Sequence, residues 1–135
     1  MKLKLLFGIL ILAVWACSPA REASKTKATL TQSSQDSTVY DILIIDPYFD
    51  QWYLMNYSPA KDRLNDYYRA KNLEAVTNWN YYYTTGKYSR IIDSLIEYSS
   101  NTDYGIEVNR KLYWYFIFFT DKYKIRLFNE QRYPN

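Results

Sequence analysis

The sequence predicts one small domain of the α+β class, mainly helical, with three or four helices packed on a small sheet or a buried strand. Three observations predict it. A β-branched apolar run of strand length opens the domain at residues 40–46. Two stretches without Gly or Pro, at 61–85 and 106–124, carry apolar side chains near helical spacing. Turn residues separate these runs, and residues 40–135 have the length of a single domain.

The first expected element is a strand that feeds directly into a short helix. Four consecutive apolar residues, Ile42 to Ile45, are typical of a strand covered on both faces. Asp46 is suited to cap a helix, with Pro47 in the first helical position. Aromatic side chains at helical spacing follow, namely Phe49, Trp52 and Tyr53.

A second start signal, Ser58-Pro59, precedes the stretch 61–85, which we expect to form one helix, or two with a break near Asn72. Gly86 is a natural stop because glycine adopts the left-handed conformation at little cost. Further along, residues 95–98 favour a second short strand that pairs with the first.

A turn at 101–105 introduces the most apolar helix, expected over 106–124. Its apolar side chains extend well around the circumference, so this helix should be central. Residues 125–128 are expected to add a last strand or a packed tail.

The expected core is rich in tyrosine and other aromatic residues. Tyr, Phe and Trp supply 24 residues between Tyr40 and Tyr133, against 18 for Leu, Ile and Val. Each aromatic side chain buries about 150–250 Å², so a few of them can fill a small core. Buried tyrosine hydroxyls then need hydrogen-bond partners.

Residues 1–16 have the layout of a signal peptide. Lys2 and Lys4 precede the stretch 5–16, which has no polar side chain. In a helix, that stretch rises only about 18 Å, too little for the roughly 30 Å hydrocarbon core of a bilayer. We therefore expect a removable signal rather than a permanent transmembrane anchor.

The segment Val14-Trp15-Ala16-Cys17 resembles the lipobox of bacterial lipoproteins. This resemblance implies a diacylglycerol thioether on Cys17, cleavage before it, and a palmitate-type acyl anchor in the bacterial cell envelope. The alternative is an ordinary secretory signal, cut after Ala16 or Ala20. We expect the anchor in the outer membrane. Because no acidic run follows Cys17, we expect the domain to lie on the periplasmic side.

The composition of residues 17–39 predicts a flexible polar tether. This stretch is rich in Ser, Thr, Ala, Lys and Gln and has no aromatic residue. Such a segment buries too little apolar surface to offset the entropy lost on ordering. Within it, Asp36-Ser37-Thr38 resembles a periplasmic O-glycosylation motif, which makes Ser37 a candidate for modification.

Charge argues against nucleic acid as a partner. The net charge of +3 comes from the signal and the tether, because residues 40–135 hold twelve basic and twelve acidic side chains. A local basic cluster remains near the C-terminus, formed by Lys122, Lys124, Arg126 and Arg132. It either complements the end of a helix or contacts acidic headgroups or cell-wall polymer.

Residue types exclude several kinds of catalysis. Histidine is absent and Cys17 is the only cysteine, which removes Ser-His-Asp and Cys-His schemes and the common zinc sites. We expect no cofactor and no metal, although Asn101, Asp103 and Gly105 echo part of a calcium loop. Asp46 and Asp50, or one of them with Asp103 or Glu107, are the carboxylates that a glycan hydrolase would use, and helix capping is the alternative role of Asp46.

An aromatic cluster at residues 79–83 is the candidate ligand platform. Trp79 and Tyr83 can face the core while Tyr81 and Tyr82 face elsewhere, so that these two tyrosines, near Asn80, can stack on a sugar ring. Plain surface packing is the alternative. The sequence thus favours a non-enzymatic binding or structural module, held to the membrane by its N-terminal lipid, with an envelope protein or glycan as partner. The alternative is a carboxylate-dependent glycan hydrolase.

Several motifs together resemble an uncharacterised bacterial lipoprotein family, domain of unknown function 6146. The resemblance covers about residues 40–127 and rests on Ile44-Ile45-Asp46-Pro47, Trp79-Asn80-Tyr81, Asn101-Thr102-Asp103-Tyr104-Gly105 and Leu112-Tyr113-Trp114-Tyr115-Phe116. It implies a lipid-anchored envelope protein. It brings no catalytic residue, because the family has no established activity.

Overall fold

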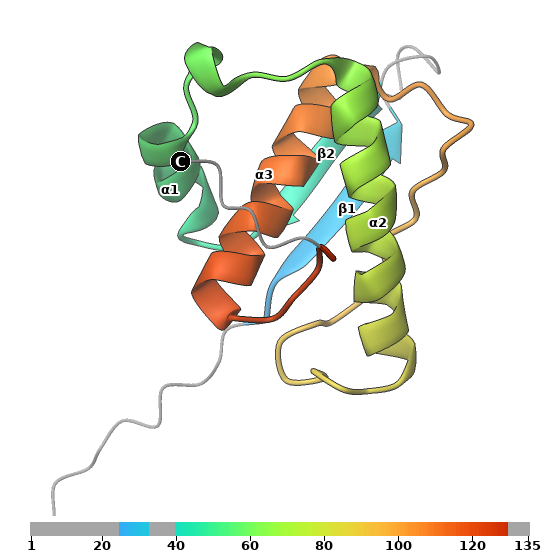
Figure 1. Ribbon diagram of the computed structural model, residues 1–135. Helices are drawn as coiled ribbons and strands as arrows, with labels where there is room; N and C mark the ends of the chain where they lie inside the picture. Colours follow the sequence, from blue (N-terminus) through green and yellow to red (C-terminus); the bar gives the residue numbers. More distant parts are fainter. Residues whose placement is uncertain (1–24, 33–39, 130–135) are drawn as a thin grey trace, which may run out of the picture.

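The computed structural model describes residues 25–32 and 40–129. Two antiparallel strands, β1 (Lys27–Gln32) and β2 (Tyr40–Ile45), are followed by helices α1 (Phe49–Asn56), α2 (Asn65–Thr84) and α3 (Gly105–Tyr123). A short 3-10 helix, η1 (Pro59–Lys61), precedes α2. Figure 1 shows α3 between the sheet, α1 and α2. The predicted small α+β fold is confirmed.

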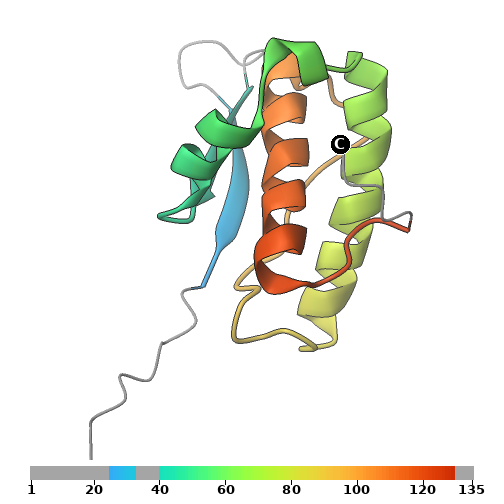
Figure 2. The ribbon, with the colours of Figure 1, turned by 60° about the vertical axis from the view of Figure 1, so that its left-hand side comes forward.

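The central position of α3 follows from its sequence. Every residue from 112 to 120 is buried, because the sheet, α1 and α2 each cover part of the helix. A helix that is apolar most of the way round has to be enclosed in this manner. Turning the molecule by 60° (Figure 2) shows α2 beside α3, and Figure 1 shows that the two helices diverge toward the end of α3. In the described part of the chain, no helix is both long and apolar enough to cross a bilayer.

The predicted helix over 61–85 is a single helix, α2, with no break at Asn72. The Asn72 side chain is fully buried and donates from Nδ2 to the carbonyl oxygen of Asn109 at 2.8 Å. Gly86 has a φ of 68°, so the predicted glycine stop is confirmed. Helix α1 begins two residues later than predicted, at Phe49, because Asp46 accepts a hydrogen bond from the Tyr48 N–H and holds Pro47 in a turn.

The partner of the first strand lies in a part of the chain that we predicted to be tether. Strand β1 pairs with β2 from Lys27 opposite Ile45 to Gln32 opposite Tyr40. The alternation of side chains explains this pairing, because Ala28 and Leu30 face the core while Thr29 and Thr31 alternate with them. The tether prediction is therefore wrong for residues 25–32. Cys17 and Ser37 lie outside the described residues.

The predicted strand over 95–98 is wrong. This segment has no regular structure, and its backbone is held instead by a side chain of α2. Asn80 donates from Nδ2 to the Ile96 carbonyl at 2.9 Å and accepts from the Ile96 N–H at 2.9 Å. Residues 125–128 form the packed tail rather than a strand, with Ile125, Leu127 and Phe128 buried.

Strand β2 is covered on one face only, contrary to the prediction. Ile42 is buried, whereas Leu43 is 54% exposed and Ile45 is 53% exposed. Successive side chains of a strand point to opposite faces, and this two-stranded sheet packs one of its faces on α3. An apolar run of four residues therefore places two of them in solvent.

The core is aromatic, as the composition predicts. Among the largest fully buried side chains are Trp79, Tyr68, Tyr115, Phe49, Phe116 and Phe119. Their polar atoms find partners: the Tyr115 hydroxyl is 2.8 Å from Thr26 Oγ1, and Trp79 Nε1 donates to the Ser94 carbonyl at 2.8 Å. Burial raises the pKa of the Tyr115 hydroxyl above its usual range. The first bond ties the residue before β1 to α3, and the second ties the segment after α2 to α2 itself.

Candidate functional site

An open groove of about 470 Å³ lies where β2, α1 and the first two turns of α3 meet. Strand β2 and helix α3 both begin at the same end of the molecule (Figure 1). Their first residues therefore line the groove together with residues of α1. The lining residues are Tyr40, Asp41, Ile42, Asp50, Tyr53, Leu54, Glu107, Val108 and Lys111. We call this the groove, and the end of the molecule that holds it the groove end.

The groove is acidic and carries aromatic side chains. Its charged lining residues are three carboxylates, Asp41, Asp50 and Glu107, and one cation, Lys111. Burial, and to a smaller extent the neighbouring Tyr57, raises the pKa of Tyr53 to about 12. Tyr53 is thus a neutral phenol at physiological pH. The lining combines hydrogen-bond acceptors with apolar ring surface, as sites for hydroxyl-rich or cationic ligands do.

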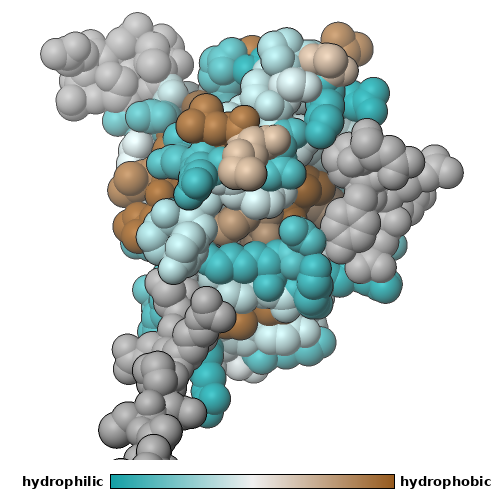
Figure 3. Space-filling model, turned by 90° about the vertical axis from the view of Figure 1, so that its left-hand side faces the viewer, coloured by the Kyte–Doolittle hydropathy of each residue, from teal (hydrophilic) through white to brown (hydrophobic). Residues whose placement is uncertain are grey.

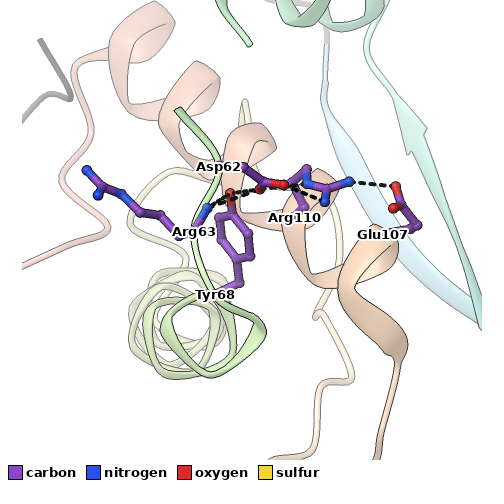
Figure 4. A network of polar contacts seen from close by, with 5 residues as sticks. All are labelled: Asp62, Arg63, Tyr68, Glu107 and Arg110. Atoms are coloured by element: carbon purple, nitrogen blue, oxygen red, sulfur yellow. Dashed lines mark hydrogen bonds and ion pairs between the residues drawn. The ribbon is translucent and has the colours of Figure 1, made fainter. Parts of the chain in front are cut away.

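A polar network holds one wall of the groove in place (Figure 4). Arg110 donates to Asp62 from Nε at 2.9 Å and from Nη2 at 2.7 Å, and its Nη1 donates to Glu107 at 2.7 Å. Tyr68 donates its hydroxyl to Asp62 at 2.6 Å and accepts from the Arg63 N–H at 3.0 Å. The hydrogen bonds from Arg110 lower the pKa of Asp62. Glu107 is positioned at the groove by this bidentate pair behind it.

A second hollow of about 400 Å³ lies on the other side of Tyr40. Its lining includes Gln32 at the end of β1, Glu97, and the ring pair Tyr98 and Tyr104, stacked at 4.9 Å. Tyr40 packs edge-on against Tyr104 at 4.8 Å, so it is shared by both depressions. The groove end therefore presents a run of fixed tyrosines among carboxylates.

On the side that carries α1, the molecular surface is mixed (Figure 3). Apolar side chains appear there in separate patches with hydrophilic ones between them. Leu54 and Met55 of α1 are the most exposed apolar residues of this helix. Scattered apolar residues are normal on a protein surface, so the groove is the distinctive feature here.

The structure does not bring the predicted ligand platform into the groove. Asn80 uses both ends of its amide on Ile96, and Tyr82 donates its hydroxyl to the Arg126 carbonyl at 2.9 Å. Tyr81 remains 60% exposed on α2. Ligand binding at these three residues stays a prediction, and Tyr81 is the one whose side chain is open to a partner.

Of the four predicted carboxylates, two line the groove. Asp50 and Glu107 do so, whereas Asp46 is buried in an ion pair with Lys122 at 2.9 Å, and Asp103 accepts from the Gly105 N–H at 3.0 Å. Within residues 25–32 and 40–129, no group of three or more Cys, Asp or Glu side chains could hold a metal ion. This Asp103 bond lies in the turn that leads into α3, and calcium binding there remains an untested alternative to that role.

Sequence reasoning missed Asp41, Lys111 and the Asp62–Arg110 pair. The pair joins residues 48 positions apart, so no spacing rule identifies it. One signal was present: Arg110 lies just before the apolar run of α3 that starts at Leu112, and a charged side chain in such a place needs a partner.

The fold and the groove together define a small, tyrosine-rich α+β domain with an open acidic depression at one end. A family model described as a family of unknown function (DUF6146) matches residues 4–132. The chain therefore belongs to this family. No curated protein and no solved structure gives a significant match to the chain.

Proposed function

We propose that the protein is a lipid-anchored component of the bacterial cell envelope, with a non-enzymatic binding domain that faces the periplasm. The observation that supports the binding role is the groove, which is lined by tyrosines, three carboxylates and one lysine. A glycan offers hydroxyls for the carboxylates to accept from, and ring faces that pack on tyrosine. A basic segment of an envelope protein fits the same charges.

Binding is tested with the purified mature chain and two probes, soluble peptidoglycan fragments and a lysine-rich peptide. We expect chemical-shift changes at Tyr40, Tyr53 and Val108 with one probe, and weaker binding in Asp41→Asn/Asp50→Asn. A matched control is Asp66→Asn, on the exposed first turn of α2. If the groove variant binds as the parent does, the groove is not the site.

The anchor is tested separately. In bacteria that express the full chain, we expect a labelled fatty acid to enter the protein, and Cys17→Ala to abolish this labelling. Incorporation of the fatty acid into the Cys17→Ala protein would overturn the proposed lipid anchor. It would not affect the proposed binding role of the groove.

A glycan hydrolase is the second candidate, favoured because Asp50 and Glu107, from different elements, line one groove. Release of reducing ends from peptidoglycan by the parent, lost in both Asp50→Asn and Glu107→Gln, would establish the enzyme. Absence of such release in the parent would exclude it for this substrate.

A further inference from the structure

Positive charge gathers at the end of the molecule opposite the groove. Three segments meet there: the start of β1, the turn after α2 and the end of α3 (Figures 1 and 2). Two interactions tie these segments together. Lys25 forms an ion pair with Asp93 at 2.8 Å, and the Tyr82 hydroxyl of α2 donates a hydrogen bond to the Arg126 carbonyl at 2.9 Å. We call this the basic end; its cations are Lys25, Lys27, Lys87, Arg90, Lys122, Lys124 and Arg126.

The basic end holds seven cations and three carboxylates, whereas the remaining described residues hold six cations and eight carboxylates. The three carboxylates, Asp46, Asp93 and Asp121, pair with Lys122, Lys25 and Lys124. Among the described residues, no carboxylate forms an ion pair with the other four cations, which are Lys27, Lys87, Arg90 and Arg126. The domain is therefore strongly polarised along α3.

Apolar and aromatic side chains accompany these cations. Ile45 lies opposite Lys27 in the sheet and is half-exposed, and Tyr48 is 60% exposed with the Lys122 ammonium 4.7 Å from its ring centre. Lys87 lies over the rings of Tyr82 and Tyr88. Tyrosines and long basic side chains together are typical of surfaces that lie at a membrane interface.

The chain leading to the anchor arrives at this same end. Eight residue steps separate Cys17 from Lys25, so an extended segment spans at most about 29 Å. A random coil of that length spans only about 16 Å. With a lipid on Cys17, the basic end is the part of the domain held nearest to the bilayer.

We propose that the basic end docks on an anionic lipid surface and so directs the groove end away from the membrane. This inference rests on the proposed lipid anchor, which would hold the basic end close to the membrane. The basic side chains, together with Ile45 and Tyr48, would then contact the lipid headgroups. Helix α3 spans 19 residues, or about 28 Å, from the groove to the basic end. The groove then opens roughly that far above the headgroups, toward the cell wall.

The test uses the mature chain, residues 17–135, whose only cysteine is Cys17. Coupled through that thiol to a maleimide lipid, the chain is anchored without cellular lipidation, so a failure here is distinct from a failure of the anchor. On phosphatidylethanolamine–phosphatidylglycerol vesicles we expect hydrogen exchange to slow at residues 45–48 and 85–93. On phosphatidylcholine vesicles, or at high salt, we expect no such protection.

Two matched double variants each remove two positive charges, one of them at the basic end and the other at a site remote from it. Arg90→Gln/Arg126→Gln at the basic end should weaken partition of the unanchored Cys17→Ser chain onto the anionic vesicles by roughly 30-fold, at roughly fivefold per charge. Lys61→Gln/Arg63→Gln, remote from this end, should change it less than about twofold. Equal effects of the two pairs, or protection at the groove end instead, would overturn the proposal.

Discussion

The two ends of this domain are built alike and charged oppositely. Each is secured by one ion pair between α3 and a segment far away in sequence: Asp46–Lys122 at the basic end and Asp62–Arg110 at the groove end. The side chain of Asp46 is 1% exposed, whereas that of Asp62 is 28% exposed. The same kind of ion pair thus stabilises the fold at one end and positions a wall of the groove at the other.

The largest expected effect is at the basic end. Lys122→Ala should lower the free energy of unfolding by about 3 kcal/mol, because it leaves the buried Asp46 carboxylate without its cation. Urea denaturation measures this. The double variant Asp46→Asn/Lys122→Met should recover most of the loss, since no buried charge remains. A loss below about 1 kcal/mol in Lys122→Ala would show that Asp46 is solvated after all.

The corresponding change at the groove end should cost less. Arg110→Ala should lower the free energy of unfolding by about 2 kcal/mol, because the Asp62 carboxylate still accepts hydrogen bonds from the Tyr68 hydroxyl and from the Arg63 N–H. Glu107→Gln is the control: Glu107 is largely exposed and should cost less than about 0.5 kcal/mol. If Arg110→Ala proves more costly than Lys122→Ala, the ranking of the two ends is reversed.

Stability at acidic pH should also distinguish the ion pairs at the two ends. Because Arg110 lowers the pKa of folded Asp62 below its unfolded value, this carboxylate stabilises the fold above about pH 4, and the contribution is lost as the pH falls through the folded pKa. In Asp62→Asn, stability should fall less between about pH 4 and pH 2 than in the parent. Lys25 likewise lowers the pKa of Asp93, but water screens that exposed pair, so Asp93→Asn should follow the parent curve closely. Coincident Asp62→Asn and parent curves would contradict this.

The smallest effects concern the predicted ligand platform on α2. Tyr82→Phe should cost about 1 kcal/mol by removing the bond to the Arg126 carbonyl. Tyr81→Phe should lie within about 0.5 kcal/mol of the parent, because its side chain is exposed. Thermal unfolding of both variants measures these two losses of stability. A larger loss in Tyr81→Phe than in Tyr82→Phe would contradict the exposed position of the Tyr81 side chain.

The sequence carried strong signals for the helices and weak ones for the sheet. Helix α3 is recognisable because nearly every residue after Leu112 is apolar, and α2 because Gly86 ends a stretch free of Gly and Pro. Strand β1 was missed because its core side chains, Ala28 and Leu30, are few and lie within a polar segment. Its stability comes from pairing with β2, a long-range property that local composition does not reveal.

The groove was only half predictable, for a related reason. Asp50 and Glu107 stand out as carboxylates at helix starts, but whether they face each other depends on how α1 and α3 pack. Asp41 gave no signal, since it follows Tyr40 in what reads as an ordinary strand. Side chains that converge from three elements become visible only when the tertiary arrangement is known.

The antiparallel pairing of β1 with β2 has a mechanical consequence. The chain reaches β1 at the basic end, and β2 starts at the groove end, so a pull applied between the residue before β1 and the groove runs along the strands. Such a load shears the ladder, straining all its hydrogen bonds together instead of opening them one at a time. Strand β1 is thus oriented so that its hydrogen bonds to β2 resist tension along the strand axis together.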